Sequence, residues 1–152
     1  MAERLFVFTI SKELPEEKLN ALLKNCSDFV NEWTAHQNKL DANCEIHGNR
    51  LLLMKVDEAY YRASGCSIDK LNRFVKEQEN SFAIELMNRL LVAYSNNGKT
   101  EVVHSSKIKE LIKDGVLSEN TPVYDNTISS SDQFSEWIKP LKETWLKKYV
   151  GI

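Results

Sequence analysis

Apolar residues follow two periodicities along this chain, and the change from one to the other predicts its elements. Residues 5–10 are rich in β-branched and aromatic side chains and end at a polar run, which indicates a first strand. After Pro15, apolar residues recur at three- and four-residue steps as far as Trp33, which predicts a long amphipathic helix. Residues 43–47 and 50–56 flank a Gly-Asn turn and predict a β-hairpin.

The next stretch predicts a second helix and a fourth strand. Gly65 and Ser67 open the helix, which carries Ile68 and Leu71 on one apolar side. Residues 82–86 fit both periodicities, and we interpret them as one extra helical turn. Residues 90–94 are typical of a strand. The order strand, helix, strand, strand, helix, strand matches the βαββαβ, ferredoxin-like motif.

The C-terminal third predicts shorter elements. We expect a strand at residues 101–103, a helix at 106–113 that Gly115 closes with a left-handed cap, and a strand at 122–124. A last helix is expected over residues 134–149, with Pro140 kinking it or shifting its start. The prediction is one α+β domain over residues 1–152, with a mainly antiparallel sheet backed by helices and β/α additions after a ferredoxin-like core.

Composition narrows the functional classes. A hydrophobic content of 42% and a charged content of 28% are typical of a packed globular chain. The net charge of -2, with basic and acidic residues interspersed, argues against nucleic acid as the main partner. No segment approaches the roughly 20 apolar residues that span a bilayer, so direct membrane insertion is not expected. Three widely separated cysteines, Cys26, Cys44 and Cys66, indicate a reducing compartment, and we predict a cytoplasmic protein.

One string matches a nucleotide-binding pattern. Residues 93–100 end in Gly98-Lys99-Thr100 and satisfy a permissive Walker A motif. A phosphate-binding loop needs a helix that starts at its Lys-Thr end, because the helix dipole faces the phosphates. A strand pattern follows Thr100, and Asn97-Gly98 is a strong hairpin-turn signal. We therefore favour a β-hairpin over a phosphate-binding loop.

A second constellation surrounds Cys66. A cysteine in the first turn of a helix faces the positive end of the dipole, which favours the thiolate, and Lys70 one turn later could add to this effect. Cys66 is thus a candidate nucleophile or redox thiol. Its base would come from His36, His47 or His104, and His36 is the one we name as a candidate. The alternative is a well-capped helix start. Its neighbours are candidate ligand-binding residues under the functional interpretation: Gly65, Ser67, Asp69 and Lys70.

The loop before this helix offers two further interpretations. Asp57, Glu58 and Asp69 could hold a divalent cation, but adjacent carboxylates on a strand point to opposite faces, so we predict no metal site. A contact surface is the other interpretation, because Tyr and Arg are enriched at binding hot spots. The residues concerned are Tyr60, Tyr61 and Arg62.

Several strings together resemble a known family. They include Trp33-Thr-Ala-His36, Ala63-Ser-Gly-Cys-Ser-Ile-Asp-Lys70, Leu91-Val-Ala-Tyr94 and Lys142-Glu-Thr-Trp-Leu146. In these strings the chain resembles, over nearly its whole length, a family of small bacterial proteins that carry the label "ABC transporter ATPase". The resemblance implies a small cytoplasmic domain and, through the label, ATP binding at Gly98-Lys99-Thr100. True ABC ATPase domains also carry a Leu-Ser-Gly-Gly-Gln signature and a Walker B carboxylate, which this sequence lacks.

The leading functional hypothesis is a non-catalytic binding or interaction domain, because no complete catalytic constellation is recognisable. Its partner would be a protein or a small molecule, no cofactor is expected, and homo-oligomerisation is left open. The alternatives are a thiol-dependent enzyme or redox protein that uses Cys66 and, third, nucleotide binding at Lys99.

Overall fold

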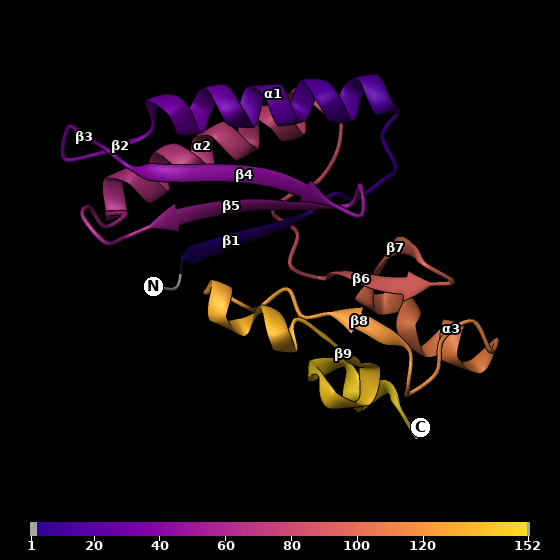
Figure 1. Cartoon of the computed structure of the whole chain (residues 1–152). Helices are drawn as coiled ribbons and strands as arrows, with labels where there is room; N and C mark the ends of the chain where they lie inside the picture. The colour runs from indigo at the N-terminus through magenta and orange to yellow at the C-terminus, as the bar shows by residue number, and fades with distance from the viewer. Residues whose placement is uncertain (1–2, 152) are drawn as a thin grey trace.

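Two antiparallel sheets and two long helices organise residues 3–151, the part of the chain that the structure, a computed structural model, describes. The first sheet has the strand order β1-β5-β4, and both long helices cover one of its faces (Figure 1). Its elements are β1 (Arg4–Thr9), α1 (Glu16–Glu32), β4 (Asp41–His47), β5 (Leu51–Asp57) and α2 (Gly65–Phe82). The predicted α+β class, with antiparallel sheets backed by helices, is confirmed.

The first sheet is buried on both faces. Even-numbered residues of β1 and β5, such as Phe8, Leu52 and Met54, face the helices and form the larger core. Odd-numbered residues, such as Leu5 and Leu53, face the opposite side and pack against the C-terminal part of the chain. The molecule therefore has three layers, with this sheet in the middle.

Both long helices pack through the apolar stripes that the sequence predicts. In α1, Leu22, Cys26 and Val30 recur every four residues and are buried. Phe29 of α1 stacks on Phe74 of α2 with ring centroids 4.4 Å apart, which holds the two helices side by side. A short β-hairpin follows α1 and consists of β2 (Thr34–Ala35) and β3 (Asn38–Lys39).

The second sheet has the order β7-β6-β8-β9 and lies below the first in Figure 1. Its strands are β6 (Leu91–Asn96), β7 (Lys99–His104), β8 (Pro122–Tyr124) and β9 (Ile138–Pro140), and α3 (Ile108–Lys113) follows β7. The predicted fourth strand thus exists as β6, but it pairs with β7 and β8 and not with β1. Within residues 3–151, the first sheet has the first, third and second predicted strands side by side, as in a ferredoxin-like order, and no fourth strand extends it beside β1.

Two predicted elements are wrong. Residues 82–86 do not add a helical turn, because α2 ends at Phe82 and Ala83 adopts a left-handed cap with φ 52°. The expected helix over residues 134–149 is replaced by short 3₁₀ turns and by β9. Pro140 has no N–H for an α-helix, whereas the edge strand β9 tolerates it opposite Pro122.

Within residues 3–151, no helix combines the length and the apolar composition that crossing a membrane requires.

Candidate functional site

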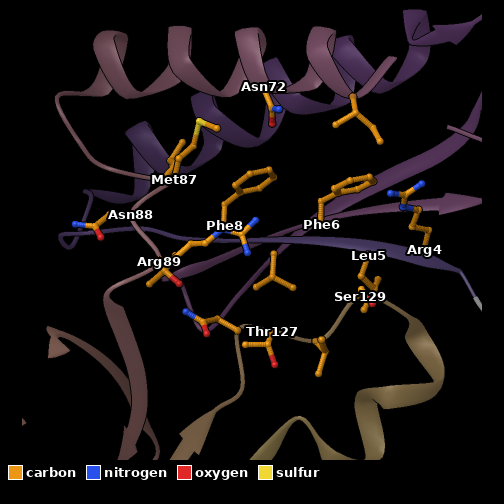
Figure 2. Close-up of a pocket in the computed structure, with 16 residues that line it drawn as sticks. Arg4, Leu5, Phe6, Phe8, Asn72, Met87, Asn88, Arg89, Thr127 and Ser129 are labelled. Atoms are coloured by element: carbon orange, nitrogen blue, oxygen red, sulfur yellow. The ribbon is translucent and has the colours of Figure 1, made fainter. Parts of the chain in front are cut away.

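A cavity of about 300 Å³ lies beside the outer edge of β1 (Figure 2). Its walls come from four separate stretches of chain: β1, α2, residues 86–89 before β6, and residues 126–129 after β8. Ligand sites span roughly 300–1,000 Å³, so this cavity lies at the small end of the range. Its location follows from the fold, because the missing fourth strand would have filled this side of β1.

The alternation of hydrogen bonds along β1 decides which groups face the cavity. The backbone groups of even-numbered residues form the hydrogen bonds to β5, as the 2.7 Å bond from the Ile10 N–H to the Arg50 carbonyl shows. Odd-numbered residues therefore direct their N–H and C=O groups to the outer edge. Within residues 3–151, nothing accepts the outward N–H groups of Val7 and Thr9.

Both ends of this open stretch are closed by the chain itself. At one end the Leu5 N–H donates to the Ser129 carbonyl over 2.9 Å. At the other end the Ser11 N–H donates to the Glu85 carbonyl over 3.1 Å. The cavity is thus bounded along β1 by a short stretch of open sheet edge with fixed ends.

The charged side chains that line the cavity are all positive. Arg4 and Arg89 line it, and the sixteen lining residues include no aspartate or glutamate. Arg4 is 3.8 Å from the Glu58 carboxylate, whereas Arg89 has no ion pair or hydrogen bond to any residue in the 3–151 range. In Figure 2 the Arg89 side chain reaches across the cavity in front of β1. An anion here would meet the uncompensated charge of Arg89, whereas Arg4 is already paired with Glu58.

Amides and apolar side chains complete the lining. Figure 2 shows Asn72 descending from α2 above Phe8, with Met87 beside it and Phe6 further along β1. Aromatic rings beside a few convergent polar groups are the usual lining of ligand pockets. The same residues include no His, Cys or Lys, so the cavity lacks a side chain that could act as a general base.

The predicted thiol site lies elsewhere. Cys66 lies in the first turn of α2, as the sequence predicts, and the structure shows that it is exposed. No hydrogen bond joins it to His36, His47 or His104 in the described chain, and His36 sits in the tight turn between β2 and β3 with φ 52°. The thiol hypothesis stays a prediction.

The residues around Cys66 have structural roles. Ser67 is fully buried, forms a capping box with Ser64, and accepts a 2.8 Å hydrogen bond from the Trp33 indole at its carbonyl. Lys70 donates to the Thr34 hydroxyl over 3.3 Å. Gly65 is the first residue of the helix, and Asp69 is exposed on it.

The loop after β5 is exposed and forms hydrogen bonds within itself. Glu58 accepts the Ala63 N–H over 2.8 Å. Tyr60 is 88% exposed and Tyr61 46% exposed, and Arg62 is exposed beside them. These side chains do not line the cavity.

The Walker-like string forms the hairpin that the sequence favours. Asn97 and Gly98 have φ values of 52° and 84° and make the turn between β6 and β7. Lys99 lies in β7 and contacts Glu13 at 3.1 Å and Glu101 at 3.6 Å. No helix begins at Thr100, so the loop lacks the dipole that a phosphate-binding loop uses.

A pair of cysteines that the sequence left apart comes together between α1 and β4. Cys26 is buried, and its interaction with Cys44 lowers the pKa of Cys44 to about 7. The same interaction, together with burial, raises the pKa of Cys26. Ser27 adds a contact of 3.6 Å from its Oγ to the Cys44 sulfur.

Sequence reasoning missed the cavity residues because their signal is spatial. The sequence analysis assigned no binding role to Asn72, Asn88 or Arg89, which lie in separate stretches of the chain. Only the departure of β6 from β1 gives them a shared space. Comparisons with family profiles, with curated proteins and with solved structures found no match, so the resemblance to the "ABC transporter ATPase" family stays a prediction.

Proposed function

We propose that this chain is a non-catalytic binding domain, and that it holds an anionic ligand with an apolar part in the cavity beside β1. The observation that carries the proposal is the lining: two arginines and no carboxylate, in a chain whose net charge is -2. A site that excludes acidic side chains while the rest of the molecule carries an excess of them favours an anion through electrostatic complementarity.

Arg89 supplies the strongest recognition element. Its guanidinium carries five N–H donors in a planar fork that matches a carboxylate bidentately. Because no residue within 3–151 occupies that fork, a ligand does not have to displace an existing ion pair. Phe6, Phe8 and Met87 add apolar surface for the uncharged part of the ligand.

A non-catalytic role is favoured by the kinds of side chain in the cavity. Proton transfer and nucleophilic attack need a titratable or activated group within hydrogen-bond reach of the ligand. The hydroxyl groups that line the cavity, those of Thr9, Thr127 and Ser129, have no histidine, lysine or carboxylate beside them in the lining. The three unbridged cysteines favour a reducing compartment, so we place this function in the cytoplasm.

A pair of probes tests the proposal. We expect 3-phenylpropionate to shift the backbone NMR signals of residues 6–9 and 86–89, and its neutral amide to bind far more weakly. Arg89→Gln should weaken binding of the carboxylate about 10-fold or more, since a hydrogen bond to a charged group contributes roughly 1.5–3 kcal/mol.

Arg73→Gln is the matched control, because Arg73 is an exposed arginine that does not line the cavity. This variant should bind 3-phenylpropionate as the unsubstituted chain does. Equal affinity for the acid and the amide, or signal changes confined to other parts of the molecule, would refute an anion site at the cavity.

A further inference from the structure

We infer that the occupant of the cavity is an extended peptide segment with an acidic side chain, which pairs with β1 as the fourth strand of the first sheet. This inference rests on the proposed function and names the class of anion that the site binds. It follows from the backbone of β1, whereas the proposed function follows from side chains.

Residues 129–131 pair with the start of β1 in the position of a fourth strand, and the pairing ends there. Ser130 forms an antiparallel bridge with Arg4, the Ser131 N–H donates to the Glu3 carbonyl over 2.8 Å, and the Leu5 N–H donates to the Ser129 carbonyl. No pairing continues to residues 126–128, which instead form a wall of the cavity. The fourth-strand position is therefore occupied at one end of β1 and open beyond it.

The open stretch presents backbone groups that normally have partners. The N–H groups of Val7 and Thr9 and the carbonyl of Val7 point to the outer edge without a partner in residues 3–151. Thr9 is only 4% exposed and Val7 is half-buried. Nearly all buried backbone polar groups in folded proteins are paired, which makes this stretch a template for strand addition.

The length of the opening sets the length of the peptide. From Leu5 to Ser11, whose N–H groups anchor the two ends, the strand rises by about 20 Å at roughly 3.3 Å per residue. Because Ser129 and Glu85 already cover the ends, about four residues of a peptide can lie along the edge. A longer segment would have to bend away at both ends.

Charge selects an acidic peptide. Arg89 reaches across the cavity without a partner of its own within the described chain, and Arg4 lies at the opposite end. A glutamate or aspartate side chain in the segment would meet the Arg89 fork, while its apolar neighbours contact Phe6 and Phe8. The main chain supplies binding and the acidic side chain supplies selectivity.

The other edge of the same sheet differs in ways that matter for recognition. β4 also has an open side, toward which the N–H groups of Ala42, Cys44 and Ile46 point. Charged Asp41 and Glu45 flank that edge, and it does not line the cavity. Charged residues on edge strands discourage pairing with another chain. This edge therefore serves as an internal control.

The test is selection from a library of N-acetylated, C-amidated hexapeptides with the unsubstituted protein, followed by amide hydrogen exchange measured by NMR. We expect the selected peptides to share one acidic position and to slow exchange of the Val7 and Thr9 amides at least 10-fold. The amides of Cys44 and Ile46 should exchange at unchanged rates. N-methylation of alternate peptide bonds should weaken binding at least 10-fold, whereas methylation of the intervening bonds should not.

Each other outcome overturns the inference. If 3-phenylpropionate binds at Arg89 but no hexapeptide competes with it, the cavity binds small anions, and the proposed function stands without strand addition. If peptides bind but Val7 and Thr9 stay unprotected, the contact is through side chains alone. If those amides become protected as the protein concentration rises, in step with dimer formation, a second copy of the chain takes the edge.

Discussion

Cys44 is the residue whose chemistry its neighbours change most in a testable way. The interaction with the buried Cys26 thiol favours the Cys44 thiolate and lowers its pKa to about 7. We expect alkylation of Cys44 by iodoacetamide to have its midpoint near pH 7, with the rate falling below that pH as the thiolate is protonated. Mass spectrometry of the folded protein, peptide by peptide, measures this, and Cys26 should stay unlabelled.

The variant Cys26→Ala isolates the cause, because it removes the interacting thiol and leaves Cys44 in place. The alkylation midpoint of Cys44 should then rise toward that of a free thiol, about 8.5. A midpoint of 8.5 in the unsubstituted chain would mean that the two thiols do not interact.

At this scale the sequence placed two cysteines on their elements. Cys66 was placed at a helix start, where it lies, and Cys26 was assigned to an apolar helix face and is buried. The exposure of Cys66 was not predicted. The link from Cys26 to Cys44 could not be predicted, because it depends on how α1 lies over β4. The same holds for Arg89. Its lack of an ion-pair partner within the described chain depends on which residues the fold places around it.

At the scale of elements, two hairpins meet at one glycine. Gly48, in the turn between β4 and β5, has φ 58°, and a Cβ there would lie 2.3 Å from the Thr100 hydroxyl of β7. Gly48→Ala should therefore lower the free energy of unfolding by about 3 kcal/mol or more, because left-handed strain and a steric clash add together. Urea denaturation measures the loss.

Gly98→Ala is the matched comparison for this substitution. Gly98 also has a positive φ, 84°, but a Cβ there meets nothing within 4 Å. It should cost only about 1–2 kcal/mol from backbone strain. Equal losses for the two variants would show that Thr100 moves aside without cost and that the hairpins are not tightly packed there.

Elements with a local cause were predictable and those with a distant cause were not. The hairpin at Asn97-Gly98, the strand at residues 5–10 and the two long helices follow from turn chemistry and periodicity, and all are present. The C-terminal residues have helical spacing, yet residues 138–140 pair with β8. The spacing of the apolar residues favours a helix there, whereas pairing with β8 favours a strand. Pro140 disfavours the helix, so the strand forms.

At the scale of the whole molecule, the first sheet joins two of the three apolar cores in residues 3–151. Its helix-facing side belongs to the larger core, and Leu5, Leu51 and Leu53 on its other side pack with Ala93 and Trp137. Opening either of these two cores would expose apolar residues of the same strands, so we expect one cooperative unfolding transition. NMR signals of Met54 and Ala93, followed in a urea titration, should disappear with the same midpoint. An earlier loss of Ala93 would mean that the second sheet unfolds separately.

The candidate site belongs to this scale, which explains why the sequence did not reveal it. The succession of elements predicted a four-stranded sheet, in which β1 would have no open edge. Instead, β6 pairs with β7 along one edge and with β8 along the other. No local sequence pattern indicates which strands will pair. The class of the fold was thus predictable, and the opening beside β1 was not.

The open edge also has a cost for the protein when no partner is bound. Unpaired N–H and C=O groups on a strand attract any extended chain, including unfolded or misfolded copies of the protein itself. The anchors at Leu5 and Ser11 limit this exposure to a few residues, too few for an extensive intermolecular sheet. The same short gap would thus both admit a partner segment and restrain aggregation.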